Sequence, residues 1–184
     1  MRWYGGVLLA VATTAIAACT GSQLPEATLT NAVDTVTLGA LAGAPLQTPA
    51  AFDITTGFPV RTDQTSSFDF VYTFDGQGRH VLVPLQALGL GSNNTANPGL
   101  QIVPETFAGI TSAPQNGYDS ADTLVIHVGD VIAARSRVAC YLSVPQYAKF
   151  QILAFDDSAK TMQMQTLSDT NCGYRGLAPG IPTS

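Results

Sequence analysis

Cysteine, histidine and charged residues are scarce in this sequence. Its 184 residues include three cysteines and two histidines, and only 11% of them are charged. Eight basic residues against 13 acidic ones give a formal net charge of −5 at pH 7. Because a negative surface repels the phosphate backbone of nucleic acid, we expect no nucleic-acid partner.

Motifs for catalysis and metal binding are also missing. The sequence has no CxxC, CxxCH or HxH spacing for metals or haem, no DxDxDG loop for calcium and no GxSxG elbow for a serine nucleophile. Ser136 lies between Arg135 and Arg137 in a β pattern, where packing explains a serine better than catalysis does. We therefore predict a protein that is not an enzyme and that has no cofactor.

The N-terminus contains the most specific local pattern. Arg2 is the only charged residue before Glu26, and an apolar run extends from residue 7 to residue 18. About 12 apolar residues match the hydrophobic region of a signal peptide and are too few to span a bilayer. The run ends in four residues that resemble the lipobox of bacterial lipoproteins, Ile16-Ala17-Ala18-Cys19.

This resemblance implies that residues 1–18 are a signal peptide and that Cys19 carries a lipid, which makes the membrane of a bacterial cell envelope a partner. Several acyl chains on one residue anchor a protein durably. Because Thr20 rather than Asp follows the cysteine, the family pattern implies the outer membrane in a cell with two membranes. The alternative is an ordinary secretory signal cleaved near Ala17 and Ala18, with Cys19 incidental.

Beyond the leader we expect a tether and one domain. Residues 19–33 start with the lipidated cysteine and contain Gly21, Ser22 and Pro25 without an apolar period, which predicts a flexible tether. Residues 34–184 suffice for one hydrophobic core, and the sequence predicts a single β domain there.

Two cysteines remain once Cys19 is assigned to the lipid. Cys140 and Cys172 form an even pair in an exported protein, and disulfides persist in oxidising compartments. We expect a disulfide between them. The alternative, two thiols that bind metal or act in redox chemistry, has neither a CxxC spacing nor a neighbouring histidine to support it.

An alternation of aromatic residues predicts the clearest strand. In residues 67–74 (SFDFVYTF) four aromatic residues recur at period two, which puts their rings on one face. A DGQG turn follows, and residues 79–83 (RHVLV) are expected to return as the hairpin partner. The four aromatic residues are Phe68, Phe70, Tyr72 and Phe74.

Other segments complete a β pattern. Residues 34–38 and 100–103 read as strands, and the Gly- and Pro-rich stretch between residues 39 and 59 leaves at most one short strand, at residues 52–55. Two further hairpins are predicted: residues 123–128 with 131–138 across Gly129-Asp130, and residues 148–155 with 161–167. No segment keeps a helical period over three turns, although residues 105–110 could form one helical turn. The predicted fold is all-β, an antiparallel β-sandwich or partly open barrel with few short helices.

The two histidines are the candidate ligands for a metal or for haem. His80 and His127 fall in different predicted strands, and two imidazoles from different strands are able to ligate one iron or metal ion. The alternative is that each is a half-exposed strand residue that hydrogen-bonds a neighbour.

Several short segments between residues 68 and 165 follow one another in a characteristic order. They are Phe68-Asp69-Phe70, Glu105-Thr106-Phe107, Ala113-Pro114, Gly117-Tyr118, Arg135-Ser136-Arg137 and residues 147–153 (YAKFQIL). In this order of features, residues 68–165 resemble the HmuY-like bacterial surface lipoproteins. The resemblance implies an all-β, lipid-anchored, binding-type domain. It does not imply haem binding, because neither His80 nor His127 aligns with the haem ligands of that group, and the Cys140–Cys172 pair is not one of its features.

Three functional hypotheses follow from these patterns. The first is a lipid-anchored, non-enzymatic domain that binds an unknown ligand or envelope protein. The second is a structural accessory subunit of an envelope or membrane complex, for which the Gly- and Asn-rich loop at residues 89–104 and the C-terminal residues 178–184 offer docking surfaces. The third is a haem- or metal-binding lipoprotein that uses His80 and His127.

Overall fold

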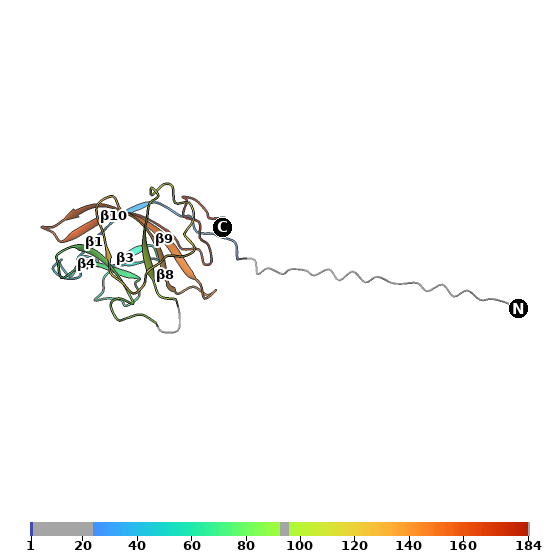
Figure 1. Ribbon diagram of the computed structural model, residues 1–184, viewed down its shortest axis with the longest axis horizontal. Coiled ribbons are helices and arrows are strands. Elements are labelled where there is room, and N and C mark those ends of the chain that lie inside the picture. Colours follow the sequence, from blue (N-terminus) through green and yellow to red (C-terminus); the bar gives the residue numbers. More distant parts are fainter. Residues whose placement is uncertain (2–23, 93–95, 184) are drawn as a thin grey trace.

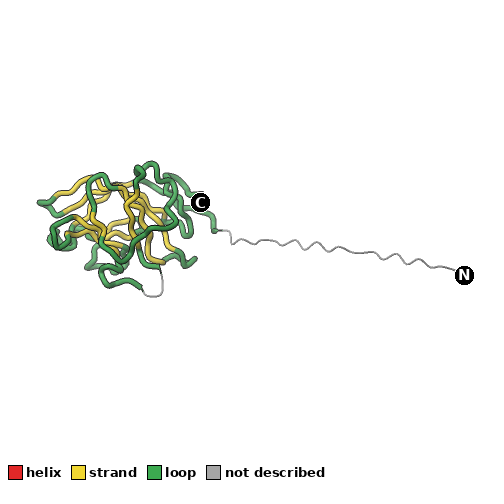
Figure 2. Tube along the Cα trace, viewed as in Figure 1, coloured by secondary structure: helices red, strands yellow, loops and turns green. Residues whose placement is uncertain are grey.

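The structure is a computed structural model that describes Met1, residues 24–92 and residues 96–183. Cys19 and residues 2–18 of the predicted signal peptide lie outside the described residues. Figure 1 and Figure 2 show strands and loops throughout the described part, and none of its residues is helical. Accordingly, the described part contains no helix long and apolar enough to cross a membrane. Its strands are β1 (Asp34–Gly39), β2 (Ala51–Asp53), β3 (Phe58–Val60), β4 (Phe70–Phe74), β5 (His80–Pro84), β6 (Gly99–Val103), β7 (Leu124–Val125), β8 (Val131–Val138), β9 (Pro145–Asp156) and β10 (Thr161–Asp169).

The strands form two antiparallel sheets of five strands each. The first sheet has the order β1-β10-β9-β8-β6, and the second has the order β3-β2-β4-β5-β7. All strand pairs are antiparallel. The sheets do not join into a barrel, so the structure confirms the predicted antiparallel β-sandwich.

The main core lies between the two sheets. Alternating side chains of both sheets point into it, including Leu38 of β1, Phe52 of β2 and Phe150 of β9. The rings of Phe52, Phe70 and Phe150 form a cluster with centroid separations of 5.1–5.7 Å. Edge-to-face and offset contacts of this kind add to the hydrophobic stabilisation from burial.

Each sheet also has an outer face that loops cover. On the first sheet, residues 104–118 and the segment after β10 pack over outward-facing side chains such as Ala133 and Leu167. On the second sheet, the segments around Phe68 and Leu88 pack over Val71 and Val81. The domain therefore has one central core and two smaller apolar clusters, all within residues 24–183, which is what a single domain needs to fold on its own.

Two of the three predicted hairpins are confirmed, residues 67–74 with 79–83 and residues 148–155 with 161–167. β4 pairs with β5, with Tyr72 opposite Leu82, and β9 pairs with β10, with Phe150 opposite Thr166. Three of the four aromatic residues predicted on one face, Phe70, Tyr72 and Phe74, pack against the central core. Phe68 lies before the strand begins and packs in the cluster on the opposite face of the second sheet instead.

The predicted hairpin of residues 123–128 with 131–138 is wrong. β7 pairs with β5 in the second sheet, whereas β8 pairs with β6 and β9 in the first. Gly129, with φ of 94°, turns the chain at this point, but the turn carries it from one sheet to the other rather than back along the same sheet. Residues 51–60 also contain two short strands, β2 and β3, where at most one was predicted, and residues 105–110 contain a turn rather than a helix.

The domain begins earlier than predicted, because residues 24–33 of the predicted tether pack on it. Asn171 Oδ1 accepts hydrogen bonds from the backbone N–H groups of Thr28 and Leu29. The backbone of Asn31 pairs with that of Gly180, and the Asn31 side chain is buried. The beginning of the described domain thus lies beside its C-terminal segment, as Figure 1 shows.

Cys140 and Cys172 form a disulfide, as predicted. Their Cα atoms are 5.7 Å apart. The bond joins the connection between β8 and β9 to the segment that follows β10, so it fixes the C-terminal segment to the first sheet.

Candidate functional site

His80 is held in an aromatic cluster at one end of the sandwich. Its Nδ1 shares a hydrogen bond of 2.8 Å with the Tyr72 hydroxyl, and its ring stacks on Phe155 with a centroid separation of 3.7 Å. Its Nε2 lies 3.4 Å from Asp157 Oδ1. Burial and the nearby Asp157 carboxylate raise the pKa of Tyr72 to about 12. Both nitrogens of His80 therefore already have partners within the domain.

His127 lies on the surface. Its side chain is 76% exposed, and its Nδ1 lies 3.3 Å from Asp130 Oδ2, which also accepts a hydrogen bond from the His127 backbone N–H. The backbones of the two histidines are neighbours, because the His80 carbonyl accepts a hydrogen bond from the Ile126 N–H. Their side chains nevertheless have different partners, Tyr72 and Asp157 for His80 and Asp130 for His127. Among the described residues, no group of three or more His, Cys, Asp or Glu side chains is placed to hold a metal ion.

Ser136 has a structural environment. Its side chain is fully buried, its Oγ donates a hydrogen bond to the Arg137 carbonyl at 2.6 Å, and it accepts one from the Gln146 N–H at 2.9 Å. The bond from Gln146 connects β9 to β8 where their register shifts, whereas the bond to the Arg137 carbonyl lies within β8.

A buried charge cluster joins the two sheets and was not foreseen from the sequence. The guanidinium of Arg137, on β8, lies 3.0 Å from Oδ1 of Asp53, on β2, and 3.2 Å from Oδ1 of Asp69, which directly precedes β4. Asp69 is fully buried and accepts hydrogen bonds from the backbone N–H groups of Ile54 and Arg137, both at 2.7 Å. Burial raises the pKa of Asp69 to about 6, although the Arg137 guanidinium and the two N–H donors act to lower it. The charged groups of the cluster are paired with one another and with backbone N–H groups, so we assign the cluster a role in the stability of the fold.

The outer face of the first sheet has a hollow of about 540 Å³, which we call the Lys149 hollow. Its floor consists of polar side chains of β9 and β10, and its walls come from the 106–111 turn, the C-terminal segment and the residue before β1. The volume lies within the range of small-molecule sites in proteins. The residues that line it are Val33, Thr106, Phe107, Ala108, Thr111, Lys149, Gln151, Gln165, Ala178 and Pro179.

Lys149 is the chemically unusual residue of this hollow. It is only 2% exposed, and its Nζ donates hydrogen bonds to the carbonyls of Phe107 at 2.7 Å and Ile110 at 2.8 Å. The same Nζ lies 4.5 Å from the centroid of the Phe107 ring. Burial lowers the pKa of Lys149. No carboxylate in the described part of the chain pairs with Lys149, which is rare for a buried lysine.

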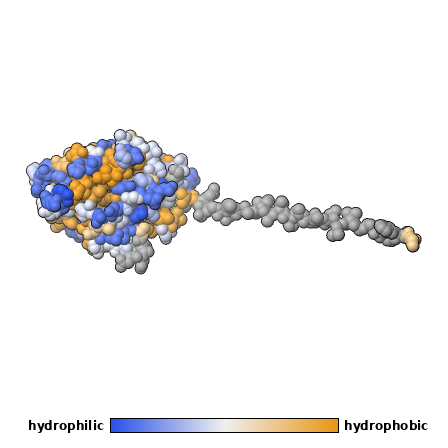
Figure 3. All heavy atoms as spheres, in the orientation of Figure 1, coloured by the Kyte–Doolittle hydropathy of each residue, from blue (hydrophilic) through white to orange (hydrophobic). Residues whose placement is uncertain are grey.

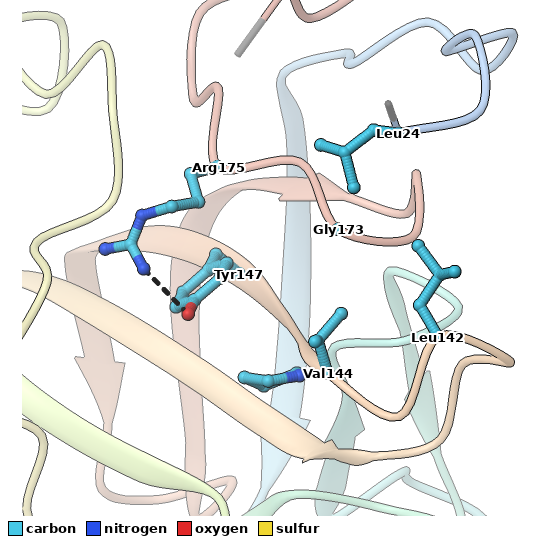
Figure 4. Close-up of a pocket in the computed structure, with 7 residues that line it drawn as sticks. Leu24, Leu142, Val144, Tyr147, Gly173 and Arg175 are labelled. Carbon is cyan, nitrogen blue, oxygen red and sulfur yellow. Dashed lines mark hydrogen bonds between the residues drawn. The ribbon is translucent and has the colours of Figure 1, made fainter. Parts of the chain in front are cut away.

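A second pocket, of about 410 Å³, lies beside Leu24, and we call it the Leu24 pocket. Figure 4 shows Leu24, Leu142 and Val144 around one apolar space, with Tyr147 and Arg175 at its other side. Arg175 Nη1 donates a hydrogen bond of 2.8 Å to the Tyr147 hydroxyl, and the guanidinium lies 4.4 Å from the Tyr147 ring centroid. Arg175 Nη2 donates to the carbonyls of residues 113 and 114. This pocket is therefore mainly apolar, and its polar residue is already engaged.

The fold and the hollow define the class of this protein as an antiparallel β-sandwich with a pocket of small-molecule size on an outer sheet face. No family model, curated protein or solved structure matches the chain. The resemblance to HmuY-like lipoproteins and the lipobox assignment therefore stay predictions.

Proposed function

We propose that this protein is a lipid-anchored, non-enzymatic binding protein of the bacterial cell envelope. The leader with its lipobox supports the anchor on Cys19. The Lys149 hollow supports the binding role, and it is the observation on which the proposal depends most. A buried cation and two side-chain amides lie at the floor of a concave site with apolar walls, which is the usual composition of a small-molecule pocket.

The arrangement favours binding over catalysis. Ser136 and His80 have full sets of internal partners, and they lie in different parts of the domain, on β8 and β5. Lys149 holds the 106–111 turn through two carbonyls, so its ammonium is fixed in place. A fixed charge in a preformed pocket favours recognition, because little ordering is needed when a ligand binds.

Native mass spectrometry of the protein purified from its own envelope tests the binding role. We expect a bound small molecule on the wild-type protein. We expect none on Ala178→Trp, which fills the hollow, and retention on Val128→Trp, a matched control at an exposed site outside the hollow. A wild-type protein without any bound molecule, or an Ala178→Trp variant that keeps it, contradicts the proposal.

Mass spectrometry of the mature N-terminus tests the anchor separately. We expect a chain that begins at an acylated Cys19. A chain with Met1 intact, or a mature terminus without acyl groups, contradicts the lipid anchor.

A structural role in an envelope complex is the second candidate. Exposed apolar side chains adjoin the Leu24 pocket: Leu24 is 43% exposed, Leu142 is 36% exposed and Tyr141 is 74% exposed. Figure 3 likewise shows apolar surface on the visible face of the domain, bordered by hydrophilic residues. A structural subunit is expected to co-purify with other envelope proteins at fixed stoichiometry and to lose them in the Tyr141→Ser, Leu142→Ser double variant. Co-purification that the double variant leaves unchanged removes this candidate.

A further inference from the structure

The Lys149 hollow contains a positive charge that the domain does not balance. Lys149 is buried, its two hydrogen-bond acceptors are neutral carbonyls, and none of the residues that line the hollow is acidic. Burial of an ion without a counter-ion is costly. An ammonium has three N–H donors, of which the two carbonyls use two. One N–H donor thus has no acceptor among the described residues, and the charge has no counter-ion there.

Two amides lie beside this charge on the same face of the first sheet. Gln151 of β9 and Gln165 of β10 are direct partners in the strand register, and both are half-buried in the hollow. Neither side chain makes a hydrogen bond to another described residue. Each amide offers N–H donors, so the floor presents several donors around a single cation.

The walls of the hollow indicate the polarity of the part of the ligand that does not contact the ammonium or the amides. Much of the lining is apolar and lies apart from the ammonium and the two amides. These apolar residues are Val33, Phe107, Ala108, Ala178 and Pro179. A small inorganic anion would leave this lining in contact with water. A ligand with an apolar body buries it and gains about 25 cal/mol for each Å² of apolar surface removed from water.

Two other ligand classes fit less well. Phosphate groups are usually bound by bidentate arginine or by several backbone N–H groups, whereas this hollow has one lysine and no arginine in its lining. A sugar ring would stack on the open face of an aromatic ring, but the Lys149 ammonium already lies over the ring of Phe107.

We propose that the Lys149 hollow binds a molecule that carries one carboxylate on an apolar body, such as a medium-chain fatty acid. The carboxylate pairs with the Lys149 ammonium and accepts hydrogen bonds from the Gln151 and Gln165 amides, while the apolar body lies along Phe107 and Ala178. This inference rests on the proposed binding function and names its ligand class.

Calorimetric titration of residues 20–184 with octanoate and with the neutral 1-octanol tests this assignment. We expect octanoate to bind at least tenfold more tightly than octanol. Lys149→Met should lower octanoate affinity at least tenfold and leave octanol within about twofold. Lys160→Met is the matched control, because Lys160 also lies over an aromatic ring, that of Phe74, but is exposed and outside the hollow. It should bind both probes as the wild type does.

A second variant covers the case in which Lys149→Met fails to fold. Gln165→Leu keeps the strand and removes one amide, and we expect it to lower octanoate affinity severalfold while octanol binds equally well or better. Equal affinity of the wild type for octanoate and octanol overturns the carboxylate assignment, as does unchanged octanoate affinity in folded Lys149→Met or in Gln165→Leu. If the envelope-purified protein nevertheless carries a molecule that Ala178→Trp excludes, the binding function stands and only the ligand class is wrong.

Discussion

The charge cluster between the sheets gives the sharpest prediction on stability. Replacing Arg137 with Met leaves Asp53 and Asp69, which are 4% and 0% exposed, without their cation. Breaking a buried ion pair by removal of one partner costs about 3–5 kcal/mol. Arg137→Met should therefore lower the free energy of unfolding by that amount.

Arg61→Met provides the matched control. Arg61 pairs with Asp63 at 2.6 Å, but both side chains are partly exposed, at 26% and 32%. An exposed pair contributes about 0.2–1 kcal/mol. Urea unfolding of residues 20–184, followed by far-ultraviolet circular dichroism, should thus separate the two variants by several kcal/mol.

The cost of Arg137→Met should also depend on pH. The folded-state pKa of Asp69, about 6, lies above its unfolded value of 3.8, so the folded protein binds this proton more tightly, and the contribution of Asp69 to stability falls as pH rises through this range. Loss of the guanidinium raises the folded-state pKa further, and the fall then continues to higher pH. The destabilisation should accordingly be larger at pH 8 than at pH 5. Equal costs for the two arginine variants, or a cost that is larger at pH 5, would refute the assignment of this cluster to stability.

Three further predictions concern the core and the loops. Phe150→Ala, in the centre of the aromatic cluster, should cost about 3–5 kcal/mol in urea unfolding, whereas Leu153→Ala on the same strand, where the side chain is 37% exposed, should cost far less; similar costs would contradict the burial pattern of β9. Replacing Cys140 and Cys172 together with alanine opens a loop of about 33 residues and should cost roughly 3–4 kcal/mol on the chain-entropy model, and thiol labelling of the unreduced wild type should find neither cysteine free. Ser136→Ala should cost about 1–3 kcal/mol, because the Gln146 N–H loses its acceptor in a buried site; a neutral effect would mean that the bond is not formed.

Local patterns were enough to predict much of the sandwich. The period-two aromatic residues of β4 and the Met and Gln alternation of β10 mark one buried face each, and both strands lie in the predicted hairpins. The error around Gly129 has a physical reason. A Gly-Asp turn between two apolar segments is compatible with a hairpin, but the choice between pairing with β8 and pairing with β5 depends on long-range contacts that the local sequence does not contain.

The Lys149 hollow, like the pairing of β7, depends on long-range contacts that the local sequence does not contain. In residues 148–152, Lys149 and Gln151 alternate with apolar residues such as Phe150. The sequence therefore indicates that Lys149 and Gln151 lie on the outer face of the sheet, while Phe150 points into the core. The local sequence does not indicate that the Lys149 ammonium is buried. The 106–111 turn, about 40 residues away in the chain, covers it, and two carbonyls of that turn accept its hydrogen bonds. The two histidines are scarce residues on neighbouring stretches of backbone, yet the side chain of His80 contacts Tyr72 and that of His127 contacts Asp130.

A crystal structure of residues 20–184 with octanoate tests the carboxylate site most directly. The carboxylate is expected at hydrogen-bond distance from Lys149 Nζ, about 3 Å, with the alkyl chain between Phe107 and Ala178. Octanoate bound elsewhere, or a Lys149 ammonium that contacts only the carbonyls of Phe107 and Ile110 in crystals saturated with octanoate, would contradict the account.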